Sequence, residues 1–391
     1  MTLVRPFRPY FGAHHTHPLG LMYLASYARA HGHNRVAIVD NRIEKLSDDA
    51  LLARILATKP DIIGITGMTS EALLMADLAR RLRRRLPHVR IVAGGSHATA
   101  WTKQTLRQGS VDVVVRGEGE AAFVGLLDAW QRGGDLRGVP GLSFLEDGRV
   151  VDTGEPTPVP DLDAQPYPAW DLIPVEKYFG QRMADQIRQH REIMTVFTSR
   201  ACPYPCTYCH DMFGKTFRAR SAAGVVDELR VLRRDYGIRE IHVADDIFNI
   251  QIKRAKEIFH RCREEGVQFV WSFPNGLRAD IMDDELLDLM RDAGVRRVAY
   301  AVETASPRFR KAIRKHLDLA KVADTVKKTA ARGIFVNGFF MLGFPGETRD
   351  EMEQTIQYAR DSEFHTVSFH RVIPNRGTAL YNESVARRSI S

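Results

Sequence analysis

Cysteine is scarce in this sequence: the 391 residues include four, and Cys202, Cys206 and Cys209 are three of them. A secreted disulfide framework spreads an even number of cysteines through a short chain, so this clustering excludes one. Long apolar runs are also missing, because no stretch approaches the ~18 consecutive apolar residues that a membrane helix needs. The N-terminus, Met1 to Pro6, lacks the basic stretch and apolar core of a secretory signal. We therefore expect a cytoplasmic protein without a membrane span.

The charge balance is positive, with a formal net charge of +8, which raises the question of an anionic partner. The densest basic run, Arg80 to Arg85, lies on a predicted helix, where such runs are usually solvated helix faces. We therefore expect no nucleic-acid partner, although a positive potential favours anionic cofactors and substrates. The hydrophobic fraction of 44% and the charged fraction of 27% are typical of a globular protein, and the length favours two domains.

Short β-rich runs alternate with amphipathic stretches in the first part of the chain. The expected strands are Thr2–Arg5, Val36–Val39, Asp61–Thr66, Arg90–Ala93 and Asp112–Val115. The expected helices are Leu19–Ala30, Asp48–Ala57, Glu71–Leu86 and Ala121–Arg132. Nearly continuous apolar strands separated by helices imply a parallel sheet covered on both faces. This is the doubly wound, flavodoxin-like pattern of an α/β domain, whose ligands bind beyond the carboxyl ends of the strands.

A different composition follows. The runs Leu142–Leu145 and Arg149–Asp152, with Asp147-Gly148 between them, predict a hairpin. Five prolines between Pro156 and Pro168 then indicate an extended linker with little helix-forming ability. We place the first domain at residues 1–138, the hairpin and linker at 139–190, and the second domain at 191–391.

The alternation of strands and helices resumes in the second domain. The expected strands are Ile193–Thr198, Glu240–Ala244, Gln268–Phe273, Arg297–Val302, Phe335–Met341 and Thr366–Arg371. The expected helices are Ala222–Tyr236, Ile252–Glu265, Asp284–Ala293, Leu319–Arg332 and Arg349–Ser362. A closed barrel of eight such units typically needs ~250 residues, so we predict a partial barrel of six. The fourth cysteine, Cys262, falls in a helical stretch and is interpreted as a half-buried helix residue.

The three clustered cysteines follow directly on the first strand of this domain, in the segment Thr198 to His210 with the spacing C-x3-C-x2-C. A structural zinc site generally uses four protein ligands, and His210 is awkwardly placed to be the fourth because it adjoins Cys209. Three thiolates can instead hold a cuboidal iron–sulfur cluster with one iron open to a small chelating ligand, a vacancy that four-cysteine clusters lack. A zinc loop and a chance cluster remain the alternatives.

This cysteine motif resembles that of the radical S-adenosylmethionine (SAM) superfamily, in which SAM chelates the open iron of a [4Fe–4S] cluster and is cleaved to a 5′-deoxyadenosyl radical. The resemblance makes Cys202, Cys206 and Cys209 the catalytic and metal-binding residues. It also implies a set of SAM contacts at the carboxyl ends of the barrel strands: Tyr208 against the adenine, Glu303, Asp245, Arg278, and Gly343 and Pro345 in the turn after the fifth strand. A polar residue that ends a strand can instead be a helix cap, which is the alternative interpretation of Asp246 and Thr348.

The first domain resembles the cobalamin-binding domain that precedes the radical SAM barrel in one large subgroup. Glycines allow close approach of a ligand to the backbone, and hydroxyl groups can contact the nucleotide tail. The residues implied to bind cobalamin are Pro18, Leu19, Gly20, Thr66, Thr69, Ser70, Gly94, Gly95, Ser96, His97, Gly117, Glu118, Gly119 and Glu120. The D-x-H-x-x-G motif that supplies a lower cobalt ligand in many such domains is absent. His14, His15 and His17 occupy the loop from which that ligand would come, although loop histidines are usually solvated.

These resemblances imply a methyltransferase that acts on an unactivated carbon of a small molecule or natural-product intermediate, through the 5′-deoxyadenosyl radical and methylcobalamin. An external electron donor of the flavodoxin or ferredoxin type is implied as a partner. The candidate substrate contacts are Tyr300, Phe339, Phe369, His370 and Arg371. For the aromatic residues among them, a position in the barrel core is an equally good interpretation.

A cobalamin-dependent cyclase, oxidase or ring-rearranging enzyme is the alternative enzyme. A tRNA methylthiotransferase is disfavoured, because the first domain has no additional cysteines and no RNA-binding tail is evident. A cobalamin sensor or scaffold with a vestigial barrel is the non-enzymatic alternative.

Overall fold

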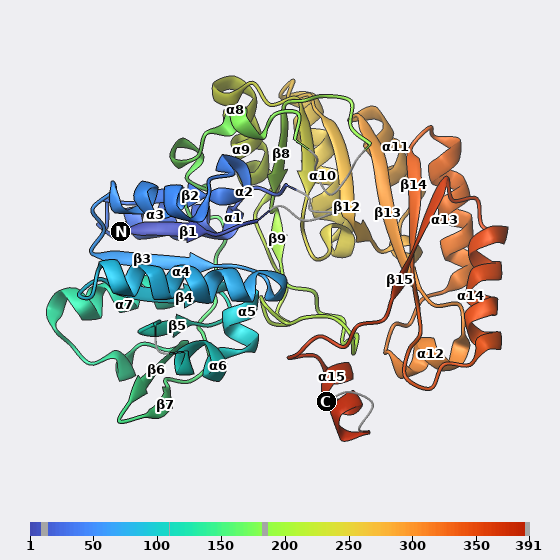
Figure 1. Ribbon diagram of the computed structural model, residues 1–391. Helices are drawn as coiled ribbons and strands as arrows, with labels where there is room; N and C mark the ends of the chain where they lie inside the picture. Colours follow the sequence, from blue (N-terminus) through green and yellow to red (C-terminus); the bar gives the residue numbers. More distant parts are fainter. Residues whose placement is uncertain (9–14, 109, 182–186, 388–391) are drawn as a thin grey trace. The chain divides into compact units, whose positions relative to one another are not determined.

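The structure is a computed structural model that describes residues 1–8, 15–108, 110–181 and 187–387. The chain forms two compact units, residues 1–183 and residues 184–391 (Figure 1). The division between them falls inside the range 139–190, where the sequence changes character. No helix in the described part of the chain is long and apolar enough to cross a membrane.

The first unit is built on a seven-stranded sheet in the order β2-β1-β3-β4-β5-β6-β7. Its strands are β1 (Thr2–Arg5), β2 (Ala37–Asp40), β3 (Ile62–Thr66), β4 (Arg90–Gly94), β5 (Val113–Val115), β6 (Leu142–Glu146) and β7 (Arg149–Asp152). The first five are parallel, in the 2-1-3-4-5 order of the flavodoxin-like fold. The β6–β7 hairpin pairs antiparallel with β5. The hairpin that the sequence groups with the linker is therefore part of this sheet.

Helices cover both faces of the sheet, as its apolar strands require. They are α1 (Leu19–Ala30), α2 (Asn41–Glu44), α3 (Asp48–Leu56), α4 (Ala72–Arg85), α5 (Gly95–Ala100), α6 (Thr102–Arg107), α7 (Glu120–Arg132) and α8 (Val175–Tyr178). The pair α3 and α4 packs on one face, where Leu52 and Leu82 join a buried cluster with Ile63 and Ile91. On α4 the basic run is matched by acids: Arg81 pairs with Asp77, and Arg83 with Asp112. These ion pairs neutralise part of the charge of the run.

The second unit is built on a six-stranded parallel sheet in the order β15-β14-β13-β12-β11-β8. Its strands are β8 (Ile193–Val196), β11 (Glu240–Val243), β12 (Val270–Leu277), β13 (Val295–Glu303), β14 (Phe335–Leu342) and β15 (Thr366–Arg371). A short antiparallel pair, β9 (Ser199–Arg200) and β10 (Arg218–Ala219), follows β8. The strands β8 and β15 end the sheet on opposite sides, so the predicted partial barrel of six units is confirmed.

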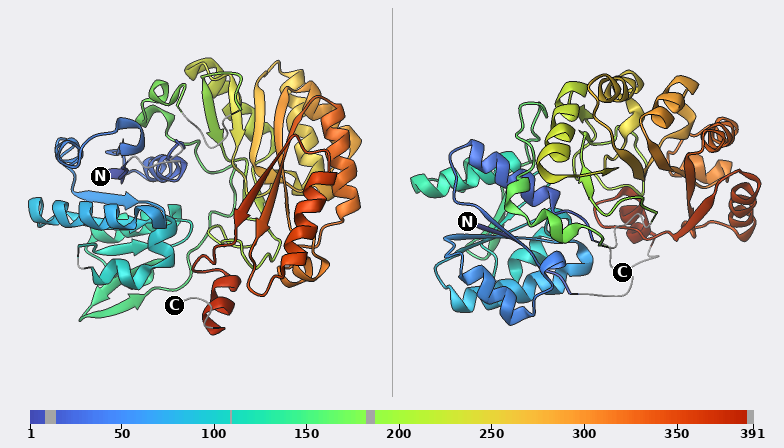
Figure 2. Two further views of the ribbon diagram at one scale, coloured as in Figure 1. Left: turned by 45° about the vertical axis from the view of Figure 1, so that its right-hand side comes forward. Right: turned by 90° about the horizontal axis from the view of Figure 1, so that it is seen from above.

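One face of this sheet is covered by helices (Figure 2). They are α9 (Ala222–Tyr236), α10 (Ile252–Glu264), α11 (Asp284–Asp292), α13 (Leu319–Ala331) and α14 (Arg349–Asp361). Two shorter helices, α12 (Pro307–Ala312) and α15 (Ala379–Ala386), lie beyond the carboxyl ends of the strands. On that face Trp271 of β12 packs edge-on against Phe259 of α10, with ring centroids 5.5 Å apart. Cys262, on the same helix, is 2% exposed and therefore belongs to the core more fully than the half-buried position predicted for it.

Candidate active site

The cysteine loop leaves the second unit's sheet at the carboxyl end of β8. Because β9 pairs with β10, residues 201–217 form a loop that is closed at its base. Cys202 and Cys206 are partly buried on it, and Cys209 is exposed. Ala201, just before the first cysteine, has a φ of 70° although it is not glycine. Such a conformation costs about 1–3 kcal/mol and persists only where the surroundings impose it.

The base of this loop is held by Asp245, two residues after the end of β11. Its carboxylate accepts hydrogen bonds from the Thr198 amide at 2.6 Å, the Thr198 hydroxyl at 2.5 Å and the Ser199 hydroxyl at 2.6 Å. Arg254 donates to the carbonyl of Thr198 at 2.6 Å. Burial raises the pKa of Asp245, although Arg254 and the hydroxyl donors oppose this effect. The structure thus uses Asp245, predicted to contact SAM, to support the cysteine loop.

The far side of the loop is held by two backbone hydrogen bonds at Thr207. Its amide donates to the carbonyl of Ile313 at 3.1 Å, and its carbonyl accepts from the amide of Leu380 at 2.8 Å. Ile313 and Leu380 belong to an apolar cluster with Phe309, Phe344 and Val372, against which Tyr208 packs. The loop is therefore supported by residues from α12, α15 and the turn after β14.

Tyr208 reaches Glu303 at the end of β13, as the resemblance implies for two residues of one site. The Tyr208 hydroxyl donates to Glu303 Oε1 at 3.1 Å, and Lys315 Nζ lies 2.9 Å from the same oxygen. Lys315 also donates to the Tyr208 hydroxyl at 3.2 Å. Burial and the Glu303 carboxylate raise the pKa of Tyr208 well above its usual range. Glu303 is buried and has a φ of 72°, a second non-glycine residue in the left-handed region.

Lys315 is a functional candidate that the sequence analysis missed. It lies in the basic segment Arg314 to His316 after α12, and nothing in its spacing distinguishes it from a surface lysine. Its side chain is only 12% exposed, and that of Glu303 is 9% exposed. The pair places one positive and one negative charge beside the cysteine loop, so a zwitterionic ligand could contact both.

The turn after β14 carries Gly343 and Pro345. Glu347 accepts hydrogen bonds from the amides of Gly343 at 2.6 Å and Phe344 at 3.0 Å. Gly343 has a φ of 85°, a conformation that glycine adopts without strain. The Phe344 ring meets Tyr208 edge-on, with centroids 6.3 Å apart. This turn is therefore adjacent to the Tyr208–Glu303 pair, and the predicted residues of three segments come together.

Arg278 directly follows β12 and connects this strand to the same region. Its guanidinium stacks on the ring of Tyr204, 4.1 Å from the centroid, and is paired with Asp280 at 2.8 Å. It also donates to the carbonyl of His316, next to Lys315. Arg278 thus joins the cysteine loop to the Lys315 segment, and most of its donors are engaged by the protein itself.

The candidate substrate contacts separate onto two faces of the sheet. Tyr300 is fully buried, and its hydroxyl lies 2.8 Å from that of Thr329 on α13, so it belongs to the helix-side core and not to a substrate site. Phe369 packs against the buried Phe340, with centroids 5.4 Å apart. Phe339 and His370 meet edge-on at 5.8 Å. Because neighbouring residues of a strand face opposite ways, Phe339 and His370 lie on the face opposite the helices. Arg371 is exposed at the end of β15.

In the first unit, the residues implied to bind cobalamin lie at the carboxyl ends of the strands and at the start of α1. Pro18, Leu19 and Gly20 open that helix, and Thr69 and Ser70 form a short turn, Thr69–Glu71, after β3. The Thr66 hydroxyl donates to the carbonyl of Gly94 at 3.3 Å. A β-carbon at Gly95 would lie 2.3 Å from that hydroxyl oxygen, and φ there is 84°, so only glycine fits. The Gly117 amide donates to the Thr99 hydroxyl at 3.0 Å.

Two of the implied residues have other partners. Glu118 accepts from the amide of Val159 at 3.0 Å, and Glu120 accepts from the side chain of Gln165 at 3.0 Å. Both carboxylates are buried. They bind the proline-rich segment to this unit, which explains why an extended stretch without helix or strand is held in a defined path. Gly119 precedes α7, where a β-carbon would lie 3.3 Å from the side chain of Val115 and 3.4 Å from that of Leu24.

His97 provides the test of whether the first unit fits a large polar ligand. It follows Gly95 and Ser96 on α5, and burial lowers its pKa. Within the described part of the chain, His97 Nδ1 and the nearby Thr105 hydroxyl are buried without a hydrogen-bond partner. Both side chains line one cavity with apolar neighbours such as Met75. Gly94 and Gly95 let a ligand approach the backbone, and they lie close to these unsatisfied polar atoms. This combination fits the nucleotide tail of cobalamin.

The three histidines before α1 lie in different surroundings where the structure describes them. His14 lies outside the described residues, and His15 is partly buried. His17, expected to be a solvated loop residue, is instead buried, with its ring 4.7 Å from that of Tyr178. Tyr178 donates to Asp40 at 2.5 Å, and Asp40 pairs with Arg5 at 2.6 Å. His17 is therefore part of a packed cluster.

The donor set of the cysteine loop fits an iron–sulfur cluster. Its three cysteines are one ligand fewer than a structural zinc site generally uses, and they leave one iron of a cuboidal cluster open. A hydrogen bond with Cys209, assisted by the charge of Lys315, lowers the pKa of Cys206 to about 6. The thiolate is the form of cysteine that binds metal, and the charge of Lys315 favours it at this loop. Burial raises the pKa of Cys202, and the bond to Cys206 raises that of Cys209.

Comparison with known proteins agrees with this geometry. The model of the radical SAM superfamily matches residues 196–359, and that of the B12 binding domain matches residues 13–127. An uncharacterized methyltransferase of Pyrococcus horikoshii is 35% identical over 94% of this chain and 78% of its own. The cytidylyl-2-hydroxyethylphosphonate methyltransferase of Streptomyces wedmorensis is 31% identical over 95% of this chain and 78% of its own. The anaerobic magnesium-protoporphyrin IX monomethyl ester cyclase of Rubrivivax gelatinosus is 29% identical over 88% of this chain and 62% of its own.

The fold is also found among solved structures. The radical SAM methyltransferase TsrM from Kitasatospora setae, with cobalamin and a [4Fe–4S] cluster bound, matches with a TM-score of 0.80 at 18% identity, covering 99% of this chain and 74% of TsrM. A structure of TsrM with tryptophan and a SAM analogue matches with a TM-score of 0.79 at 20% identity, covering 94% of this chain and 72% of TsrM. Taken with the cysteine loop, the Tyr208–Glu303 pair and the glycine-rich strand ends, these matches show that the chain belongs to the radical SAM superfamily, in the group that carries a B12-binding domain.

Proposed function

We propose that this chain is a cobalamin-dependent radical SAM methyltransferase that acts on a small molecule. The observation that carries the proposal is the contact of Tyr208, on the cysteine loop, with Glu303 and Lys315. It brings one carboxylate and one ammonium group within hydrogen-bond distance of a side chain only one position from Cys209. Two relatives of more than 30% identity are both named as methyltransferases.

The chain's own residues would bind and orient SAM. SAM carries an amino group, a carboxylate and ribose hydroxyls, so Glu303 can accept hydrogen bonds from it and Lys315 can neutralise its carboxylate. Tyr208 and Phe344 offer aromatic surface to the adenine. Holding the reacting atoms in one orientation removes much of the entropic cost of the reaction. The thiolates of Cys202, Cys206 and Cys209 would hold the cluster.

The cofactors would supply the chemistry that protein side chains cannot: the cluster would provide an electron for SAM cleavage, and cobalamin would provide a methyl group for transfer. The first unit's part is to bind cobalamin through the backbone at Gly94 and Gly95 and the polar side chains of Thr66 and His97. Phe339 and His370, on the face of the sheet away from the helices, are the proposed substrate contacts. An external donor of the flavodoxin or ferredoxin type would deliver the electron.

The proposal is tested with reconstituted protein under anaerobic conditions, with dithionite or a reduced flavodoxin as the source of electrons. The wild-type protein should show absorption of both an iron–sulfur cluster and cobalamin, and should convert SAM into S-adenosylhomocysteine and 5′-deoxyadenosine. The variant Cys206→Ala should lose cluster absorption and SAM cleavage. Cys262→Ala is the matched control, because that cysteine is buried in α10, and it should keep both. Absence of SAM cleavage by cluster-loaded wild-type protein would refute the proposal and favour a sensor or scaffold.

A second candidate function is a cyclase or another rearranging enzyme with the same cofactors. It is favoured by the likeness to the cyclase of Rubrivivax gelatinosus, which extends over most of this chain. The products separate the two candidates. Methyl transfer yields S-adenosylhomocysteine and 5′-deoxyadenosine together, whereas rearrangement yields 5′-deoxyadenosine without S-adenosylhomocysteine.

A further inference from the structure

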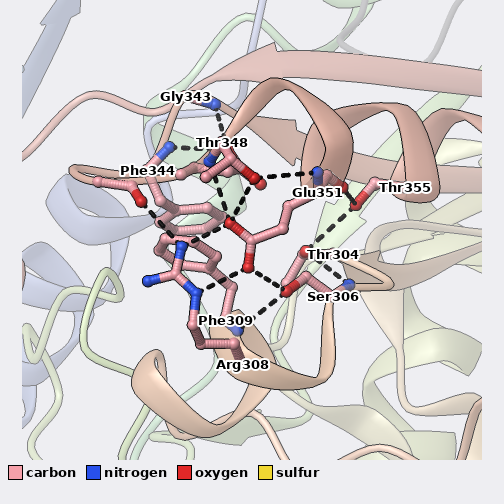
Figure 3. Close-up of polar contacts among 11 residues, drawn as sticks. Thr304, Ser306, Arg308, Phe309, Gly343, Phe344, Thr348, Glu351 and Thr355 are labelled. Atoms are coloured by element: carbon pink, nitrogen blue, oxygen red, sulfur yellow. Dashed lines mark hydrogen bonds and ion pairs between the residues drawn. The ribbon is translucent and has the colours of Figure 1, made fainter.

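Two turns of the second unit are joined by a network centred on Glu351, in the first turn of α14 (Figure 3). Glu351 Oε1 accepts from the Ser306 hydroxyl at 2.9 Å and from Arg308 Nε at 2.7 Å. Its other oxygen accepts from Arg308 Nη2 and from the amide and hydroxyl of Thr348, both at 3.0 Å. One carboxylate therefore connects the turn after β13 with the turn after β14.

Further contacts strengthen the connection. Arg308 also donates to the carbonyl of Gly346 at 2.8 Å, so its guanidinium spans both turns. The Thr355 hydroxyl, one turn along α14 from Glu351, accepts from the amide of Ala305 at 3.1 Å. The pKa of Glu351 is held far below its usual range, chiefly by Arg308. The carboxylate is consequently ionised at any pH at which the protein is handled.

The connected turns are those that carry the SAM-site residues. The first follows directly on Glu303, whose φ of 72° is strained for a non-glycine residue, and the second contains Gly343. A strained backbone persists only where its surroundings over-determine it. The contacts of Ser306 and Ala305 with α14 begin two residues after Glu303. They fix the chain at the point where it would otherwise relax and turn the carboxylate away from Tyr208 and Lys315.

We propose that Arg308 and Glu351 are positioning residues for SAM binding, which lock the turn that presents Glu303 against the turn that presents Gly343. This inference rests on the proposed function, because it requires that the two connected turns bind SAM. Neither residue touches the ligand. Loss of the ion pair frees the backbone at Glu303 and weakens SAM binding, while the reaction of bound SAM is left nearly unchanged.

Glu351 also has an ordinary structural role, since it forms a capping box with Thr348 at the start of α14. The variant Glu351→Gln separates the two roles, because glutamine serves equally well at this position of a capping box. Arg308→Gln removes the other partner, and the Arg308 side chain is 58% exposed, so this variant should fold. Arg349→Gln is the matched control: it removes an exposed arginine that pairs with Glu353 on the same helix at 2.9 Å.

The experiment measures the equilibrium dissociation constant for SAM on cluster-loaded protein, the kcat of SAM cleavage, and amide hydrogen exchange on cluster-free protein. Arg308→Gln and Glu351→Gln should each weaken SAM binding about fivefold, the effect of losing roughly 1 kcal/mol. The double variant should bind SAM no more weakly than either single variant, because the pair acts as one unit. Exchange should speed up at residues 303–309 and 343–348 only, and Arg308→Lys should recover part of the affinity.

Equal SAM affinity for the wild type, Arg308→Gln and Glu351→Gln would overturn the inference, as would an equal loss in Arg349→Gln. A fall in kcat with unchanged affinity would also overturn it. If the wild-type protein binds no SAM, the proposed function fails instead. The exchange measurement on cluster-free protein then still decides whether the ion pair locks the two turns.

Discussion

His97 makes the stability of the first unit depend on pH. Burial lowers its pKa, so the unfolded chain binds a proton at this residue more readily than the folded one does. The contribution of neutral His97 to the free energy of unfolding is therefore fully present above about pH 6.5. It falls as the pH drops below this value, by at most about 1.4 kcal/mol for each pH unit. His97→Asn, which carries no titratable group, should flatten this part of the curve. Urea unfolding of cofactor-free protein between pH 7.5 and 5.5 measures the difference.

A suitable control is His31→Asn, because His31 is exposed at the end of α1. Its curve should run parallel to that of the wild type. The prediction fails if His97→Asn and the wild type lose stability equally on acidification, since His97 would then be protonated in the folded state at no cost.

At the scale of single residues, the sequence predicted which segments meet at the site better than it predicted what each side chain contacts. Cys202 and Tyr208 were predicted from the spacing of the cysteine motif, and Glu303 from a strand segment that resembles one of the same family. Asp245 was assigned to SAM because it ends a strand, yet it accepts three hydrogen bonds from the base of the cysteine loop. Lys315 was missed because its partner, Glu303, is brought close only by the tertiary fold.

Among the elements, α15 has the most specific role that the sequence analysis did not foresee. Leu380 is buried beneath the cysteine loop, and its amide donates to the carbonyl of Thr207. Leu380→Ala should cost about 2–4 kcal/mol of local stability by leaving a cavity there. After reconstitution, the variant should lose iron to a chelator at least tenfold faster than the wild type does.

The control for this prediction is Val385→Ala on the same helix, where the side chain is 44% exposed. It should retain iron as well as the wild type does. If both variants release iron at the wild-type rate, α15 does not support the loop. If both release it equally fast, the effect belongs to the helix as a whole and not to the contact of Leu380.

Among the helices, long ones were predictable and short ones were not. The bounds predicted for α1 and α9 match the structure, because a dozen or more residues with one apolar face give a clear period. The helices α5, α6, α12 and α15 have six to eight residues, too few for such a period. They form where tertiary contacts and caps such as Thr378 support them.

On the scale of the whole molecule, each unit has its own sheet and core, so each should respond to its own cofactor. Hydroxocobalamin at about one hundred times its dissociation constant should stabilise the first unit by about 2.7 kcal/mol. Amide exchange should then slow at the strand ends near residues 66–70, 93–97 and 115–120. SAM added to cluster-loaded protein should slow exchange near residues 303–306 and 343–346.

Cobalamin that protected residues 303–306 and not 93–97 would contradict this assignment of cofactors to units. Matched samples with SAM alone and cobalamin alone provide the controls. The sequence analysis predicted the β6–β7 hairpin but grouped it with the linker, whereas in the structure the hairpin joins the first sheet through β5. Which strand a hairpin pairs with is a long-range property that its own residues do not encode.

The two outer strands of the second sheet, β8 and β15, each have one neighbour in the sheet. A closed ring fixes its own diameter through the number and stagger of its strands. An open arc has no such constraint, because its outermost strands can separate without breaking any backbone ladder. The same six units can thus accommodate reactants of very different bulk.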